Sequence, residues 1–391
     1  MSSTSHRELV TLEIGQGAKF ESQSGLHSAA PRIYGSLCGP KGGKVAGLIM
    51  HPTSNFMGHY LLDPCQKLGL PILALNTRFV NNDTTLTMER TLEDVGAGVR
   101  FLKKHFERVV LIGNSGGASL MAFYQAQAER PFIHNTPAGD PISLTMEQCP
   151  PGDGIAILAG HPGRSHLMAH WIDPSVIEER DSLSAFPALN LFEPGRGVPF
   201  DAEFLEEYRS EQRARIERIT AYAHRRLQYL RSLAEPIQDE ALVVYRTYAD
   251  PRFLDLTLDS NDRAIGGNRA GSDGSTKSTN NAVSTLARFS SLTGWLSQWS
   301  SESRADGPTN LAKTSVPVLQ MEYTADASIF PSDVSRWSAS CPGRETSVRV
   351  PRGTHYLKNQ PELIELVAST VSDWANEIGP VQPHIASLEH S

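Results

Sequence analysis

Short apolar runs, each long enough for one buried strand, recur in two parts of this chain. Runs of four to eight residues rich in Val, Ile and Leu are typical of strands that are buried on both faces of a parallel sheet. The predicted strands are 8–14, 32–38, 45–50, 70–75, 108–113 and 154–160 in the first part, and 316–323 and 347–350 in the second.

Segments with helical periodicity separate these runs. Residues 87–106 place Met88, Leu92, Val95 and Val99 three or four positions apart, which predicts an amphipathic helix with its charges on the other face. Further helices are predicted over 58–68, from the serine turn to about 128, over 331–337 and from 361 onward. This alternation predicts an α/β fold with a doubly wound, mostly parallel sheet that is covered on both faces.

The alternation stops at about residue 161 and resumes near residue 315. The sequence between predicts a long charged helix over 201–233, a strand over 242–245, a mobile stretch rich in Gly, Ser and Asn at 266–281, and an amphipathic helix carrying Leu286, Phe289, Leu292, Leu296 and Trp299. We therefore expect residues 1–160 and 305–391 to form the core. Residues 161–304 are expected to form a large, mainly helical lid, or cap, inserted after the sixth core strand.

One segment of the core carries the pattern of a nucleophile. The apolar run 109–112 leads into Gly113-Asn114-Ser115-Gly116-Gly117, and a helical stretch follows. This is G-x-S-x-G between a strand and a helix, where the serine occupies a sharp, strained turn with its hydroxyl exposed. The glycines allow strand and helix to approach closely, and the start of the helix offers unpaired N–H groups. Ser115 is therefore predicted to be a nucleophile.

Two downstream loops supply partners for Ser115. A serine hydroxyl needs a base to take its proton, and that base needs an acid to orient it. Asp326 follows the seventh predicted strand and His355 follows the eighth, so both should lie at the carboxyl edge of the sheet, where open α/β sheets bind ligands. Glu322, within the strand, and Asp333, in the next helix, are the alternatives for the acid.

Together these pieces resemble the α/β-hydrolase superfamily, over roughly 45–160 and 315–378. The resemblance covers the serine motif, the turn after the third strand and the two downstream loops. It implies that Ser115 is the nucleophile, that His355 acts first as general base and then as general acid, and that Asp326 orients His355. It also implies that the inserted segment is a lid, without indicating a subfamily.

The oxyanion of such a reaction needs N–H donors. The backbone N–H of Gly116 is one candidate, and the turn His51-Pro52-Thr53 offers the other, which we assign to Thr53. This turn departs from the His-Gly that is usual in the family. Proline has no N–H, so Pro52 cannot donate and the choice lies between Thr53 and Ser54.

Several other histidines could carry chemistry. His166 and His170 are spaced for one face of a helix and, with His161, could hold a metal ion. No H-E-x-x-H pattern or further ligand accompanies them, so no metal site is predicted. His51 and His59 flank the expected oxyanion turn, where a structural role and a substrate-lining role are equally open.

Composition narrows the class of protein. The chain has 391 residues, 39% of them hydrophobic, and a net charge of −7 from 36 basic and 43 acidic residues. No basic stripe points to nucleic acid, no apolar stretch reaches the roughly 18 residues of a membrane span, and the start lacks the profile of a signal peptide. Four scattered cysteines predict reduced thiols and a cytoplasmic protein.

We expect a serine hydrolase that cleaves a carboxylic ester or lactone of a moderately bulky, hydrophobic small molecule, with no metal or organic cofactor. The charged face of 201–233 could serve a homodimer contact. A thioesterase, an amidase or a carbon–carbon bond hydrolase would use the same three residues. The alternative from another class is a non-catalytic ligand-binding protein of this fold, although binding alone needs no base.

Overall fold

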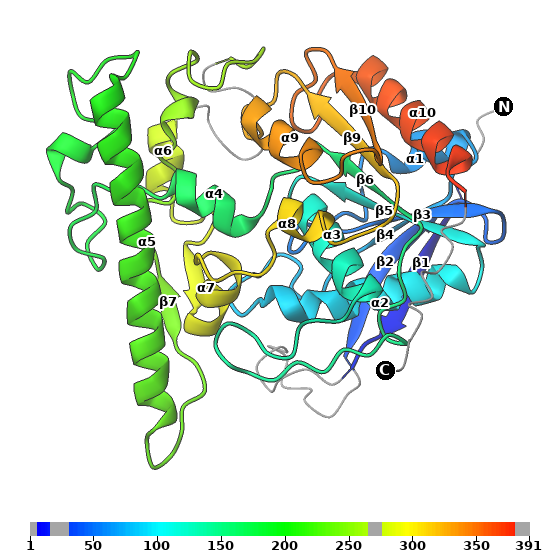
Figure 1. Cartoon of the computed structure of the whole chain (residues 1–391), viewed down its shortest axis with the longest axis horizontal. Coiled ribbons are helices and arrows are strands. Elements are labelled where there is room, and N and C mark those ends of the chain that lie inside the picture. The colour runs from blue at the N-terminus through cyan, green and yellow to red at the C-terminus, as the bar shows by residue number, and fades with distance from the viewer. Residues whose placement is uncertain (1–5, 16–30, 265–275, 380–391) are drawn as a thin grey trace, which may run out of the picture.

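The structure is a computed structural model that describes residues 6–15, 31–264 and 276–379. Its centre is an eight-stranded sheet (Figure 1). The strands are β1 (Arg7–Glu13), β2 (Arg32–Cys38), β3 (Val45–Ile49), β4 (Ile72–Leu75), β5 (Arg108–Asn114), β6 (Gly154–Leu158), β9 (Val318–Tyr323) and β10 (Glu345–Val350). Their order is β1-β2-β4-β3-β5-β6-β9-β10, with β2 antiparallel to both its neighbours and the other pairs parallel. The predicted doubly wound, mostly parallel sheet is confirmed.

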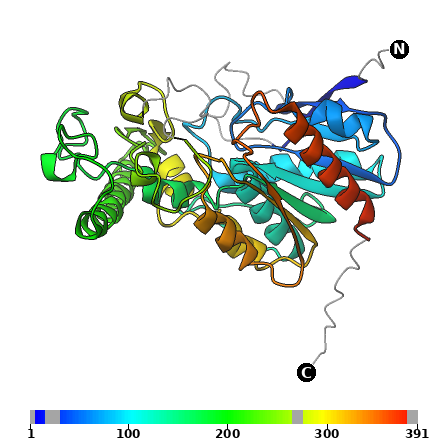
Figure 2. The ribbon, with the colours of Figure 1, turned by 90° about the horizontal axis from the view of Figure 1, so that it is seen from above.

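Helices cover both faces of this sheet. They are α1 (Leu62–Lys67), α2 (Met88–Lys103), α3 (Gly116–Glu129), α8 (Gly307–Leu311), α9 (Pro331–Ser338) and α10 (Pro361–Glu377). Along β5, Val109 and Leu111 pack against α2, α3 and α8, whereas Val110 and Ile112 pack toward α1 and α10. Neighbouring residues of a strand point to opposite faces, so a strand buried on both sides is apolar at every position. Figure 2 shows α9 and α10 on opposite sides of the sheet.

Residues 161–304, here called the insertion, leave the sheet after β6 and form the part on the left of Figure 1. The insertion contains α4 (Arg164–Trp171), α5 (Ala202–Arg231), β7 (Ala241–Val243), α6 (Thr276–Asn281), β8 (Phe289–Ser291) and α7 (Leu292–Gln298), with single 3₁₀ turns η1 (Pro187–Leu189) and η2 (Pro251–Phe253). The long charged helix predicted over 201–233 is α5. It begins after Asp201, whose side chain accepts a hydrogen bond from the Phe204 N–H at 2.7 Å.

Parts of the insertion differ from the sequence prediction. The helix expected to carry Leu286 and Phe289 begins only at Leu292, because Phe289–Ser291 instead pairs with β7 as an antiparallel strand. Ser291 then caps α7 by accepting a hydrogen bond from the Gly294 N–H at 3.0 Å. Of the stretch at 266–281, residues 276–281 form α6 and the remainder lies outside the described residues.

The insertion has an apolar cluster of its own, built from side chains of α4, α5 and α7. Trp295 is fully buried there, and its indole N–H donates to Thr220 Oγ1 at 3.1 Å. The amphipathic face of α5 is therefore covered within the insertion. None of the described helices is both long and apolar enough to cross a membrane.

We predict that Trp295→Ala lowers the free energy of unfolding by about 3–5 kcal/mol, because it empties a buried indole site and leaves Thr220 without its donor. Urea unfolding followed by circular dichroism measures the change. Leu183→Ala is the control, since Leu183 is 85% exposed in the same insertion and its removal should change stability by less than about 0.5 kcal/mol. Equal effects of the two substitutions would contradict the assigned core.

Candidate active site

The turn between β5 and α3 holds Ser115 in a backbone conformation that residues with a side chain rarely adopt, at φ 55° and ψ −124°. A Cβ at Gly113 would overlap the Cα of Ala118, and a Cβ at Gly117 would overlap the carbonyl oxygen of Met50. Close packing of strand, turn and helix therefore requires glycine at both positions and maintains the strain at the serine. Ser115 is only 8% exposed, yet it lines a cavity.

The structure brings Ser115, His355 and Asp326 together. His355 Nε2 lies 2.9 Å from Ser115 Oγ, and His355 Nδ1 lies 2.6 Å from Asp326 Oδ2. The other oxygen, Asp326 Oδ1, accepts hydrogen bonds from the backbone N–H groups of Ser328 at 2.7 Å and Ile329 at 3.1 Å. These two donors fix the carboxylate, which in turn holds the proton of His355 on Nδ1 and leaves Nε2 free to accept the serine proton.

The two alternative acids are engaged elsewhere. Glu322 accepts a hydrogen bond from Arg349 Nε at 2.8 Å, which joins β9 to β10 away from the serine. Asp333, in the first turn of α9, accepts from the Phe330 N–H at 3.0 Å and lies 2.8 Å from His166 Nε2. Neither carboxylate contacts His355.

Several solved structures are similar to this chain. The structure of DcsB in complex with its substrate analogue is 11% identical with a TM-score of 0.53, covering 96% of this chain and 100% of that one. The esterase domain from Rhodothermus marinus is 12% identical with a TM-score of 0.46, covering 96% and 100%. Bromoperoxidase from Bacillus anthracis is 13% identical with a TM-score of 0.44, covering 94% and 100%. No family model matches the chain, and no curated protein matches it either.

The sheet order, the serine at the turn from β5 to α3 and the histidine after the last strand decide the architecture. The chain has the α/β-hydrolase fold. Within this fold, Gly116 is the first residue of α3, so its backbone N–H has no acceptor in the preceding turn of the helix. That N–H belongs to the residue directly after Ser115, and its role as an oxyanion donor stays a prediction.

The second predicted oxyanion donor, the Thr53 N–H, already has a hydrogen-bond partner in this α/β-hydrolase fold. The Thr53 N–H donates to His51 Nδ1 at 3.1 Å, and the Ser54 N–H donates to the same atom at 2.8 Å. The two backbone N–H groups that remained as candidates once Pro52 was excluded therefore both donate to the His51 ring. His59, at the far end of the same loop, is buried and its Nε2 lies 3.1 Å from Asn114 Oδ1.

A cavity of about 490 Å³ adjoins Ser115 and His355, between the core and the insertion. Its polar lining includes His51, Asn82, Asp83, His161, Arg164, Ser284 and Thr285. Its apolar lining includes Leu167, Trp171, Leu286, Trp299 and Ile329. The space is large enough for a small molecule of drug-like size and offers it both polar and apolar contacts.

Arg164 is a lining residue that the sequence analysis missed. It begins α4, is 5% exposed, and donates to Thr53 Oγ1 at 2.8 Å and to Asp83 Oδ2 at 2.9 Å. Its guanidinium carbon lies 4.8 Å from the centre of the Trp299 ring. Burial lowers the pKa of this guanidinium, and Asp83 opposes that shift. The sequence position could have indicated Arg164, because this residue follows the carboxyl end of β6 just as His355 follows the carboxyl end of β10.

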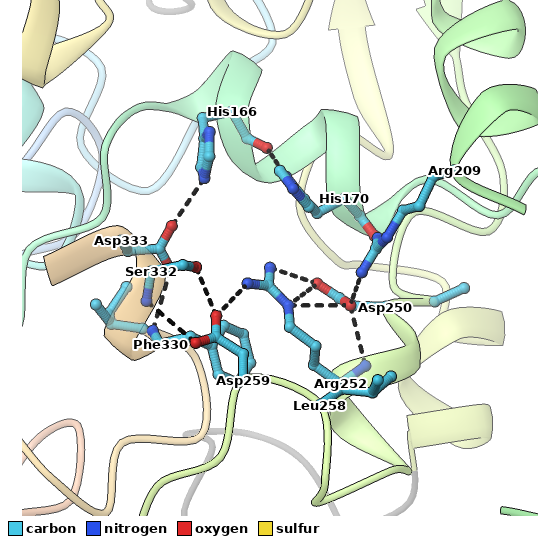
Figure 3. Close-up of polar contacts among 12 residues, drawn as sticks. His166, His170, Arg209, Asp250, Arg252, Leu258, Asp259, Phe330, Ser332 and Asp333 are labelled. Carbon is cyan, nitrogen blue, oxygen red and sulfur yellow. Dashed lines mark hydrogen bonds and ion pairs between the residues drawn. The ribbon is translucent and has the colours of Figure 1, made fainter. Parts of the chain in front are cut away.

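The histidine pair on α4 belongs to a polar network that joins the insertion to α9 (Figure 3). His166 faces Asp333, and His170 Nδ1 lies 2.9 Å from the carbonyl oxygen of His166. Nearby, Arg252 pairs with Asp250 at 2.8 Å and with Asp259 at 3.1 Å. Within the described residues, no group of three or more His, Cys, Asp or Glu side chains is arranged to hold a metal ion.

Burial keeps three histidines neutral, which predicts a pH dependence of stability. It lowers the pKa of His59 and His170 to about 4 and that of His161 to about 3, from 6.5. The unfolded chain takes up these protons below pH 6.5 while the folded chain does not. Stability is therefore lost as the pH falls from 6.5 toward 4, by about 1.4 kcal/mol per pH unit for each histidine.

Urea unfolding at pH 7, 6 and 5 tests this expectation. His59→Gln keeps a group that can bond Asn114 but cannot titrate. The free energy of unfolding of this variant should therefore fall less steeply with pH, by the slope that corresponds to about one bound proton. His134→Gln, which removes an exposed imidazole, is the matched control. An unchanged slope in His59→Gln would contradict the assigned neutral state.

Proposed function

We propose that this chain is a serine hydrolase that cleaves a carboxylic ester or lactone through an acyl-enzyme on Ser115. The observation that carries the proposal is the continuous chain of contacts from Ser115 Oγ to His355 Nε2, at 2.9 Å, and from His355 Nδ1 to Asp326 Oδ2, at 2.6 Å. A nucleophile, a base and an orienting acid in hydrogen-bond reach define the geometry needed for nucleophilic acyl transfer.

In the first half-reaction, Ser115 Oγ attacks the carbonyl carbon of the substrate while its proton passes to His355 Nε2. The carbonyl π electrons move to oxygen, and the resulting oxyanion accepts a hydrogen bond from the Gly116 N–H. When the tetrahedral intermediate collapses, the bond to the leaving oxygen breaks. His355 Nε2 gives its proton to that oxygen, and the acyl group remains on Ser115.

In the second half-reaction, His355 Nε2 takes a proton from a water molecule, whose oxygen attacks the acyl carbon. The bond to Ser115 Oγ then breaks, the proton returns to Oγ, and a carboxylic acid leaves. Asp326 stabilises the imidazolium in both halves without itself taking the proton. None of these steps calls for a metal or an organic cofactor.

The cavity supports a moderately bulky substrate with mixed chemistry. Leu167, Trp171 and Trp299 can hold an apolar portion, as proposed from the sequence. Arg164 and Asp83, paired at 2.9 Å, add a polar wall and favour a substrate that also carries a hydrogen-bonding group. Since part of this wall comes from the insertion, we propose that residues 161–304 act as the lid of the site.

Related activities share the same machinery. A thioesterase, an amidase or a carbon–carbon bond hydrolase would need only a different leaving group, and the lining residues favour none of these. The hydrogen-bonded Ser115, His355 and Asp326 argue against a purely ligand-binding protein. The four cysteines are buried and none of them is joined to another by a disulfide, which supports a reducing compartment such as the cytoplasm.

We predict that an alkyl fluorophosphonate labels the wild-type chain at Ser115 and does not label Ser115→Ala, because only an activated serine reacts at neutral pH. Intact-protein mass spectrometry measures the adduct. Ser119→Ala is the matched control, since Ser119 is buried one turn further along α3 and should not affect labelling. Equal labelling of Ser115→Ala would refute the proposed nucleophile.

The acid is tested by comparing Asp326→Asn with Glu322→Gln. Asp326→Asn should lower kcat for a short nitrophenyl ester by about 10³–10⁴-fold, because an amide cannot hold the required tautomer of His355. Glu322→Gln should lower it by less than about twofold, because Glu322 pairs with Arg349 at the sheet and does not contact His355. A larger loss in Glu322→Gln than in Asp326→Asn would reverse the assignment.

A further inference from the structure

The tautomer of His51 is fixed by its surroundings. Two backbone N–H groups, from Thr53 and Ser54, both point at His51 Nδ1, at 3.1 and 2.8 Å. An atom that receives two donors must be an unprotonated acceptor, so the single proton of the neutral ring lies on Nε2. Desolvation, helped by the charge of Arg164, lowers the pKa of His51 well below 6.5. His51 is therefore a neutral imidazole with one N–H available on the side away from its loop.

The Nε2 atom of His51 lies close to the turn that carries Ser115. A Cβ placed on Gly116 would lie 2.6 Å from His51 Nε2 and 2.8 Å from His161 Nε2. Both rings thus approach the residue that follows the nucleophile, and both line the cavity with Ser115 and His355. His161 is 6% exposed and its Nδ1 has no hydrogen-bond partner among the described residues, so its tautomer is not fixed as that of His51 is.

We propose that the Nε2–H of His51 donates to the oxyanion formed when Ser115 is acylated, together with the backbone N–H of Gly116. The side chain takes the place of a backbone donor from this loop. Pro52 has no N–H, and the N–H groups of Thr53 and Ser54 already donate to His51 Nδ1. No bond forms or breaks at His51, which keeps its proton and strengthens its hydrogen bond as charge develops on oxygen. The inference rests on the proposed function and adds to it the second oxyanion donor.

The test compares His51→Leu with the wild-type chain. We expect His51→Leu to slow phosphonylation of Ser115 by a fluorophosphonate, and to lower kcat for a short nitrophenyl ester, by about 10²–10³-fold, with KM nearly unchanged. Affinity for a trifluoromethyl ketone, which forms a tetrahedral oxyanion on the serine, should fall in parallel. His51→Gln, whose amide N–H can reach a similar place, should recover part of the loss.

His59→Gln is the matched control. It alters a second imidazole of the same loop, and both rings contact Phe56, at centroid distances of 5.3 and 4.8 Å. Damage to the loop would therefore affect both variants, whereas loss of an oxyanion donor affects His51 variants alone. Circular dichroism and thermal melting establish that each variant folds, and His51→Phe, which keeps a ring but has no N–H to donate, carries the test if His51→Leu does not fold.

The outcomes separate the two proposals. If the wild-type chain reacts at Ser115 but His51→Leu reacts equally fast, the freed Thr53 or Ser54 N–H suffices and only the present inference fails. A large loss in His161→Leu with none in His51→Leu would assign the donor to the other ring and would also overturn it. If the wild-type chain does not react at Ser115, the proposed function fails and the inference fails with it.

Discussion

The strained backbone of Ser115 is the constraint on which the site depends. A residue at φ 55° and ψ −124° costs about 1–3 kcal/mol and persists only where its surroundings leave no alternative. Here the surroundings are β5, paired on both sides with β3 and β6, and α3, which is buried along nearly its whole length. The same buried core that stabilises the fold therefore stabilises the turn that presents the serine to the cavity.

The insertion helps to hold the loop that carries Asp326. Asn261 donates to the carbonyl oxygen of Asp326 at 2.9 Å, and Asp262 accepts a hydrogen bond from Thr324 at 2.5 Å. Asp259 accepts a bond from the Ser332 hydroxyl, also at 2.5 Å, as part of the network in Figure 3. Because these contacts involve the loop that carries Asp326 and the first turn of α9 that follows it, a displacement of the insertion would disturb Asp326 as well as the cavity wall.

The core was predictable from the sequence. Its central strands are buried on both faces and therefore appear as continuous apolar runs, and its helices repeat apolar residues every three or four positions. The insertion was less predictable: Phe289 and Leu292 fit one helical stripe, yet pairing with β7 separates them into a strand and a helix. At the site, Ser115, Asp326 and His355 could be predicted because each follows the carboxyl end of a predicted strand. The hydrogen bonds of His51 could not be predicted in the same way, because they depend on how three consecutive residues turn back on one ring.

The surroundings of three histidines at the cavity bear on which ring serves as the base in the proposed mechanism. His51, His161 and His355 line the same cavity as Arg164, whose positive charge disfavours a charge on His51 and on His161. Burial lowers the pKa of both His51 and His161 below 6.5 and so keeps both rings neutral. His355 is the ring of these three that contacts a carboxylate, Asp326. In the proposed mechanism, a proton arriving from Ser115 is therefore best stabilised on His355, and His51 stays neutral with its Nε2–H available to the oxyanion.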